Sequence, residues 1–317
     1  MNYQLNDKRC LVSGSTAGIG FAIAAALAAE GAEVIINGRT DDRVAEAMAR
    51  ITKTQPDAKL RAFAGDLSDA DQVGEIYRRY SKIDVLVNNV GMYEPKPFEK
   101  ITDDDWHKII EVNFFSGVRL SRAYLPVMLN HNWGRIIFIS SESAVQIPKE
   151  MIHYGVTKTM QLALSRGLAE TTIGTGVTVN SVLPGPTASE GVEGFVKNMA
   201  KEQGKSPAQV EKEFFQTVRP SSLLQRFATN EEVANLVTYV ASPLSSATNG
   251  AALRVDGGVV RSLLEGSRRT PCDGLPYLRA PPREVEHHLA PRTECAGYQT
   301  GREGTRVPTF RCLSCHA

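Results

Sequence analysis

Cysteine is almost absent from the first 270 residues of this 317-residue chain, which contain only Cys10. The other four lie close to the end of the chain: Cys272, Cys295, Cys312 and Cys315. A disulfide framework for the main body is therefore excluded. The last two have the spacing of a metal-ligand pair, and His316 with the remaining cysteines leaves a zinc site as an alternative. Zinc needs four ligands, however, and no second close pair is present, so we assign no metal and expect free thiols.

The sequence also lacks excess charge and long apolar runs. Its formal net charge is +1, which gives no reason to expect nucleic acid or an anionic membrane as partner. The longest apolar run, from Phe21 to Ala29, falls far short of the roughly 20 residues of a membrane-spanning helix. The polar N-terminus has no apolar segment typical of a secretory signal. We therefore expect a cytoplasmic protein that binds neither membrane nor nucleic acid.

The first 260 residues alternate between short β-rich runs and helical patterns. Seven runs are predicted strands: RCLVSG, AEVIING, KLRAFAG, IDVLVNN, GRIIFIS, GVTVNSVLP and AALRVDG. Most are continuously apolar, as in strands buried on both faces. The intervening helical segments, such as 19–30 and 42–52, predict βαβ units. We therefore predict one α/β domain over residues 1–260, with a doubly wound, Rossmann-type parallel sheet.

Three short motifs predict helix starts. Capping boxes are expected at Ser68–Asp71, Ser206–Gln209 and Thr229–Glu232. Pro207, at the first helical position, strengthens the second of them.

Two regions interrupt this alternation. Residues 189–225 form an insertion with two short predicted helices, placed where an α/β protein builds its ligand cleft. Its apolar side chains fit either a cleft wall or a core: Val192, Phe195, Val196, Met199, Phe214 and Phe215. Its Lys197, Lys201 and Lys205 fit a solvated helix face better than a site for an anionic substrate. Residues 261–317, with nine Arg, no Lys and six of the sixteen Pro, predict a disordered or loosely packed extension.

A glycine-rich turn between the first strand and the first helix predicts a phosphate-binding site. The stretch GSTAGIG allows a tight turn and close backbone approach to a phosphate, and the helix N-terminus supplies N–H donors. The expected contacts are Gly14, Ser15, Thr16, Gly18, Ile19 and Gly20. A turn that binds nothing is the alternative.

Four polar residues further along predict a catalytic group. Tyr154 and Lys158 are four residues apart, so they share one helix face. Ser141 ends a strand thirteen residues earlier, and Asn113 lies on a preceding helix. A free phenol has a pKa of about 10, and a nearby ammonium lowers it toward the working pH. The phenol can then act as an acid and base, while Ser141 hydrogen-bonds the same substrate oxygen.

Together these motifs resemble the classical short-chain dehydrogenases/reductases, including members like the 3-oxoacyl reductases, over residues 5–258. The resemblance implies that Asn113, Ser141, Tyr154 and Lys158 are the catalytic tetrad. Lys158 would also hold the nicotinamide ribose, and Asn113 would anchor a water that links Lys158 to solvent. His153, beside Tyr154, is expected in the pocket wall or on the surface and not as a base.

The resemblance also implies further cofactor contacts. Asp66 would bind the adenine and Leu67 would line its pocket. Asn89 and Gly91, in NNVG, would run beside the cofactor, although Val90 replaces the usual Ala. In the loop LPGPTAS, the expected contacts are Pro184, Gly185, Thr187 and Ser189, and either hydroxyl can reach the nicotinamide carboxamide.

The end of the second strand bears on the choice of cofactor. An acidic residue there binds the ribose diol of NAD, but this chain has Gly38 followed by Arg39. An arginine can bind a 2′-phosphate, so we expect NADP(H) in preference to NAD(H).

The predicted function is hydride transfer between NADP(H) and a small carbonyl or secondary-alcohol substrate. An NAD-dependent alcohol or polyol dehydrogenase and a non-catalytic binding module are the alternatives. By resemblance we expect a homodimer or homotetramer that assembles through the helical segments 102–131 and 151–173.

Overall fold

The computed structural model describes residues 2–263, apart from the side chains of Glu193 and Phe195. Seven strands form its sheet: β1 (Arg9–Val12), β2 (Glu33–Gly38), β3 (Lys59–Ala64), β4 (Val85–Asn88), β5 (Gly134–Ile139), β6 (Val177–Pro184) and β7 (Ala252–Val255). All neighbours pair in parallel, in the order β3-β2-β1-β4-β5-β6-β7. The predicted strands and the doubly wound parallel sheet are confirmed.

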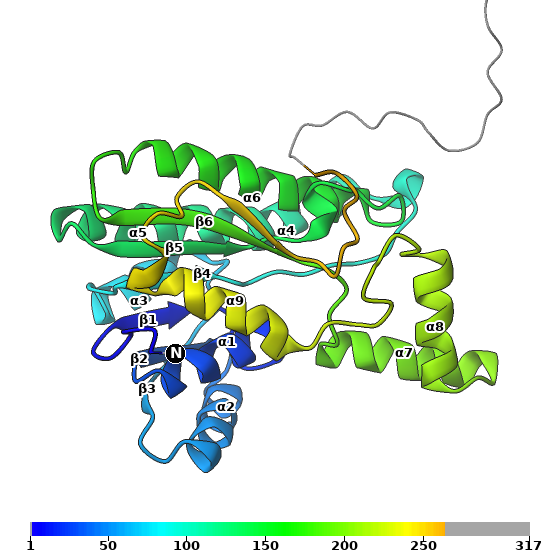
Figure 1. The fold of residues 1–317 in the computed structure, drawn as a ribbon, viewed down its shortest axis with the longest axis horizontal. Coiled ribbons are helices and arrows are strands. Elements are labelled where there is room, and N and C mark those ends of the chain that lie inside the picture. The colour runs from blue at the N-terminus through cyan, green and yellow to red at the C-terminus, as the bar shows by residue number, and fades with distance from the viewer. Residues whose placement is uncertain (1, 264–317) are drawn as a thin grey trace, which may run out of the picture. The chain divides into compact units, whose positions relative to one another are not determined.

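Nine α-helices connect and cover these strands in the described part of the chain. They are α1 (Gly18–Ala29), α2 (Asp41–Thr54), α3 (Ala70–Arg79), α4 (Asp103–Ile110), α5 (Ser116–Asn130), α6 (Ile152–Glu170), α7 (Glu190–Gln203), α8 (Pro207–Thr217) and α9 (Asn230–Ala241). Figure 1 shows α7 and α8 together, beyond the end toward which the strands point. The two helices predicted for the insertion are therefore present, at the edge of the sheet where a ligand cleft is expected.

Alternate residues of each central strand enter two separate cores. On β1, Cys10 and Val12 pack with α1, α2 and α9 on one face, whereas Leu11 packs with α3, α5 and α6 on the other. On β5, Ile137 and Phe138 divide in the same way. Burial on both faces explains why the strands read as continuous apolar runs.

Two of the three predicted capping boxes are confirmed. Ser206 and Thr229 each accept a hydrogen bond from the backbone N–H three residues on, and the side chain at that position bonds back. The third prediction is wrong, because the cap of α3 is Asp69 and not Ser68. The Ser68 hydroxyl instead donates to Asp66 at 2.7 Å, which leaves the Asp69 carboxylate to receive the first N–H groups of the helix.

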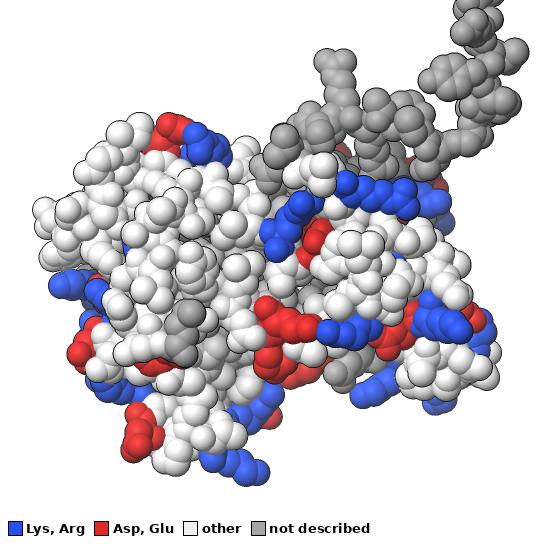
Figure 2. Space-filling view, viewed as in Figure 1, with Lys and Arg blue, Asp and Glu red and all other residues white. Residues whose placement is uncertain are grey.

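Charge is mixed on the face drawn in Figure 2, where basic and acidic side chains alternate without a large area of one sign. None of the helices within residues 2–263 has the length and apolar character needed to cross a membrane. The predicted extension from 264 onward, with its four cysteines and His316, lies outside the described residues, as does the side chain of Phe195.

Candidate active site

A cavity of about 660 Å³ opens at the carboxyl ends of the strands. The residues that line it include Ile19 from the glycine turn, Gly91 after β4, and both Ser141 and Tyr154. The sheet order reverses between β1 and β4, and ligands of open α/β sheets bind beside such a reversal. The fold therefore gathers the predicted phosphate loop and the predicted catalytic residues around one space.

Tyr154 and Lys158 lie on the first two turns of α6. The Lys158 ammonium lies 5.6 Å from the centre of the Tyr154 ring, and it donates to the Ile139 carbonyl at 2.9 Å and to Gln161 at 3.3 Å. Lys158 is only 4 % exposed, so these oxygens replace part of its hydration. The i, i+4 spacing thus places the two side chains together, as predicted.

Asn113 lies in a single π-helical turn, Glu111–Phe115, between α4 and α5. Its side chain accepts from the Met92 N–H at 2.7 Å and donates to the Met92 carbonyl at 2.9 Å. Its own carbonyl accepts from Gln161 at 2.6 Å. Such π-turns are frequent at functional sites, and this one connects the loop after β4 to the helix that carries Lys158.

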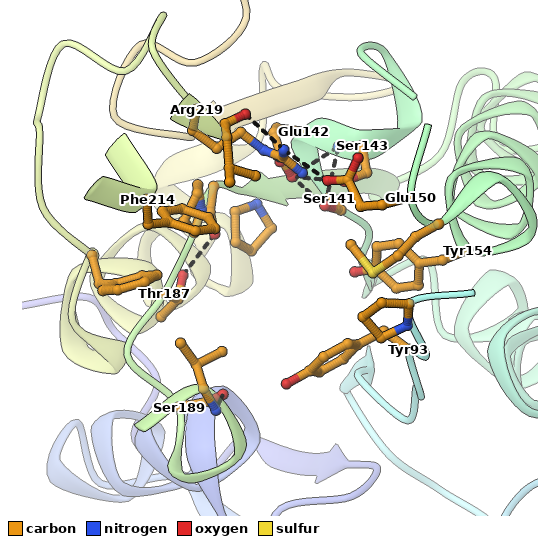
Figure 3. A pocket seen from close by; sticks show the side chains of 18 of the residues that line it. Tyr93, Ser141, Glu142, Ser143, Glu150, Tyr154, Thr187, Ser189, Phe214 and Arg219 are labelled. Carbon is orange, nitrogen blue, oxygen red and sulfur yellow. Dashed lines mark hydrogen bonds and ion pairs between the residues drawn. The ribbon is translucent and has the colours of Figure 1, made fainter. Parts of the chain in front are cut away.

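Ser141, directly after β5, contacts a buried carboxylate. Its hydroxyl donates to Glu142 at 2.5 Å, and the same carboxylate oxygen accepts from the backbone N–H of Ser143 at 2.8 Å. The other oxygen of Glu142 accepts from Arg219 at 3.2 Å. Arg219 also contacts Glu150 at 3.0 Å. Figure 3 shows these charged side chains grouped beside Ser141 at one end of the cavity.

Burial determines the protonation of the two α6 side chains. It raises the pKa of Tyr154, and the Glu142 carboxylate raises that pKa further, while the Ser141 hydrogen bond and the Arg219 charge act in the opposite direction. Burial also lowers the pKa of Lys158 to about 8. The sequence led us to expect a lowered Tyr154 pKa, and the structure shows the opposite direction because burial has the largest effect. Tyr154 is therefore a protonated phenol at neutral pH, ready to donate.

The glycine turn is held in place by two buried or partly buried asparagines. Asn37, on β2, accepts from the Gly14 N–H at 2.9 Å and donates to the Gly65 carbonyl at 3.0 Å. Asn89 donates to the Gly14 carbonyl at 3.0 Å. A Cβ at Gly20 would lie 2.3 Å from that same carbonyl oxygen, so only glycine fits there.

The start of α1 leaves backbone donors for a ligand. Its N-cap residue, Ala17, makes no side-chain cap hydrogen bond, in contrast to Thr40, Asp69 and Thr229 at the starts of α2, α3 and α9. Uncapped N–H groups and the positive end of the helix dipole suit a phosphate. The residues present thus fit a dinucleotide, and Gly18 and Ile19 would hold its phosphates.

Comparison with known proteins agrees with this geometry. A family model described as enoyl-(acyl carrier protein) reductase matches residues 14–260. The chain belongs to the short-chain dehydrogenase/reductase family. It is accordingly an NAD(P)-dependent oxidoreductase.

The relatives of this oxidoreductase align with most of its length. It is 47 % identical to an uncharacterized oxidoreductase, YvaG, of Bacillus subtilis, across 83 % of this chain and 100 % of the relative. It is 32 % identical to a D-beta-hydroxybutyrate dehydrogenase of Cupriavidus necator, across 81 % and 99 %. A solved structure of L-sorbose reductase from Gluconobacter frateurii, complexed with NADPH and L-sorbose, superposes with a TM-score of 0.78 at 28 % identity, across 83 % and 100 %.

Three residues predicted as cofactor contacts have other partners in this oxidoreductase. Ser15 is fully buried, and both its N–H and its hydroxyl bond to Asn37, so it fixes the turn instead of offering donors to a ligand. Leu67 is 1 % exposed and packs in the core with α3 and α5. Asp66 accepts from the N–H and the hydroxyl of Ser68 through one oxygen, Oδ1.

Several of the other expected contacts line the cavity, whereas Gly14, Thr16, Gly18, Gly20 and Arg39 are not among its lining residues. Its lining includes Asn89, Gly91, Pro184, Gly185, Thr187 and Ser189. The Thr187 hydroxyl donates to the Gly185 carbonyl at 2.9 Å, whereas the Ser189 hydroxyl accepts from the Val192 N–H and keeps its own proton. Ser189 is therefore the better placed of the two to donate a hydrogen bond.

The sequence led us to expect His153 in the pocket wall or on the surface, but it lies in neither place. It is 2 % exposed, its ring lies against Trp106 of α4 with centres 5.9 Å apart, and burial lowers its pKa. Its ring packs between α4 and α6. That His153 is not a base stays a prediction.

Sequence reasoning missed several residues of the site. Tyr93 lines the cavity with its ring 6.3 Å from that of Tyr154. Glu142 could have been found from the sequence, because this carboxylate directly follows Ser141 in a run of hydroxyl residues. No sequence pattern pointed to Arg219, since it is 77 residues away in sequence from Glu142. No three His, Cys, Asp or Glu side chains within residues 2–263 gather as metal ligands.

Proposed function

We propose that this oxidoreductase transfers a hydride between NADP(H) and a carbonyl or secondary-alcohol substrate, with Tyr154 as general acid and base. The observation that carries the proposal is the single cavity that joins Ile19 of the glycine turn to Ser141 and Tyr154. The nicotinamide supplies the hydride when bound. The residues of the chain supply the proton, the orientation of the substrate and the exclusion of water.

Each catalytic side chain has a defined part in this proposal. Tyr154, protonated at neutral pH, donates to the substrate oxygen as negative charge develops there. Ser141 orients that oxygen. Lys158, still largely protonated below pH 8, favours the phenolate that remains and would bind the ribose. Asn113 fixes the backbone turn at Met92, beside the space where the nicotinamide would lie.

The end of β2 supports a preference for the phosphorylated cofactor. A Cβ at Gly38 would lie 2.4 Å from the Thr16 methyl carbon and 3.2 Å from Val44, so no acidic side chain fits at this position without displacing them. The next side chain, Arg39, is exposed. A guanidinium there can bind a 2′-phosphate by charge-assisted hydrogen bonds.

One observation favours the alternative, NAD(H). The first turn of α2 places two exposed carboxylates, Asp41 and Asp42, close after Arg39 in the chain. Like charges disfavour a phosphate group, so the preference rests on Arg39 outweighing them.

Replacing Arg39 with Ser tests the cofactor preference. Because the substitution removes the charge for the 2′-phosphate, we expect NADPH to bind about tenfold more weakly and NADH to be unaffected. Fluorescence titration gives both dissociation constants, and reduction of a panel of neutral ketones tests turnover with both cofactors. Arg78→Ser on α3, an exposed arginine paired with Glu75, is the matched control. Wild-type protein that binds NADH as tightly as NADPH would contradict the preference.

A further inference from the structure

Three charged side chains form one end of the cavity, beside Ser141. Arg219 is 8 % exposed and Glu142 is 5 % exposed, and Glu150 completes the group. Two carboxylates and one guanidinium leave this charged cluster with a formal charge of −1. The cluster lies next to the residue that must contact the substrate oxygen.

Arg219 is already committed to carboxylates of the chain itself. Its Nε donates to Glu142 at 3.2 Å, and its Nη1 donates to Glu150 and to the Val218 carbonyl, each at 3.0 Å. A guanidinium can bind a carboxylate by two parallel hydrogen bonds, either through Nε and Nη2 or through Nη1 and Nη2, and each such pair of nitrogens forms one edge of the group. Each edge of Arg219 already meets a carboxylate, so a carboxylate on a substrate could bind in a bidentate manner only by displacing Glu142 or Glu150.

The Glu142 side chain is held in this position by further hydrogen bonds. One of its oxygens accepts from the Ser141 hydroxyl, the Ser143 N–H and the Ser143 hydroxyl, at 2.5, 2.8 and 3.1 Å. These three hydrogen bonds fix the Glu142 side chain beside Ser141.

The other basic side chains offer no replacement cation at this end of the cavity. Lys158 is the only other Lys or Arg among the described lining residues, and it bonds to Ile139 and Gln161. Lys201 and Lys205 of the insertion are exposed and do not line the cavity, and Lys205 pairs with Glu213. The remainder of the wall is largely apolar, with Val192, Val196, Met199, Phe214 and Phe227.

We infer that the substrates are uncharged carbonyl compounds or alcohols with an apolar chain, and that Glu142 and Glu150 exclude carboxylates by neutralising Arg219. This inference rests on the proposed function and names the substrate class for it. A carboxylate that entered the cavity would lose hydration, meet a guanidinium already paired with two carboxylates, and face the excess negative charge of the charged cluster. Arg219 thus determines substrate specificity because its pairing with Glu142 and Glu150 keeps it from binding a substrate carboxylate.

A matched pair of substrates tests the inference. Acetoacetamide and acetoacetate have the same ketone and nearly the same shape, but only the second is charged. With NADPH at neutral pH, we expect kcat/KM to favour the amide by about tenfold or more. Glu150→Gln keeps the shape and releases one edge of Arg219, so this ratio should fall severalfold through a lower KM for acetoacetate. Glu75→Gln, on the surface of α3, should leave the ratio unchanged.

A binding measurement separates this inference from the proposed function. Hexanamide and hexanoate are titrated into the protein–NADPH complex and followed by cofactor fluorescence, without turnover. Tighter binding of the amide supports the inference even if neither ketone is reduced, an outcome that counts against the proposed function alone. Equal binding, tighter binding of hexanoate, binding of neither ligand, or an unchanged ratio in Glu150→Gln overturns the inference.

Discussion

Replacing Tyr154 with Phe is expected to lower kcat/KM for ketone reduction by about a thousandfold. The substitution removes the one hydroxyl proton that this account gives to the substrate oxygen, and it leaves the ring in its contact with Tyr93. Because the phenol is protonated at neutral pH, the loss should appear as a lower kcat and not as a weaker binding of cofactor. Steady-state rates of NADPH oxidation give the first quantity, and fluorescence titration gives the second.

Two results define the outcome for Tyr154. Tyr239→Phe, which changes a partly exposed tyrosine of α9, should retain the wild-type rate. If Tyr154→Phe also turned over at the wild-type rate on a good substrate, the chain would not use this residue as its acid.

Replacing Lys158 with Met is expected to change how stability depends on pH. Burial lowers the Lys158 pKa from 10.5 to about 8 in the folded chain, so the unfolded chain binds more protons between these values. Stability of the wild type should therefore rise with pH across this window as the cost of the buried charge disappears. Each pKa unit corresponds to about 1.4 kcal/mol, so the rise relative to Lys158→Met should approach about 3 kcal/mol.

Denaturant titrations without cofactor measure this difference. The free energy of unfolding is determined for both proteins between pH 7 and roughly pH 10, the range over which the Lys158 proton is lost. Buried tyrosines and Cys10 also respond to pH, but both proteins contain them and their contributions largely cancel. Lys53→Met, at the exposed end of α2, should follow the wild type. Parallel curves for wild type and Lys158→Met would show that the buried ammonium carries no such cost.

The strands and helices could be predicted because each kind of element leaves a local pattern in the sequence. Strands such as Gly134–Ile139 are buried on both faces and need an unbroken apolar run, and helices such as Asn230–Ala241 begin at a complete capping box. The cap of α3 was misplaced because Ser68 and Asp69 are both good cap residues. Only the three-dimensional contact of Ser68 with Asp66 decides between them.

The site was predictable where its residues lie close together or in the family's motifs. The shared face of Tyr154 and Lys158 follows from helix geometry alone. The charged cluster was not predictable, because Arg219 meets Glu142 only when the insertion folds back over the end of β5. The direction of the Tyr154 pKa was also missed, since spacing indicates a nearby lysine but not the depth of burial, which has the larger effect.

Assembly into a homodimer or homotetramer stays a prediction. The helices proposed for it are α4, α5 and α6, which Figure 1 shows beside one another. Sedimentation velocity would measure the mass of the particle in solution directly.

The transfer of a labelled hydride tests the central claim most directly. The reduced cofactor carries deuterium at the transferred position of the nicotinamide, and a neutral ketone from the panel is reduced in ordinary water. Mass spectrometry then shows where the label goes. We expect one deuterium on the carbinol carbon of the alcohol with the wild type, and almost no alcohol with Tyr154→Phe. Alcohol without deuterium, or cofactor oxidation that yields no alcohol, would contradict direct hydride transfer to the carbonyl.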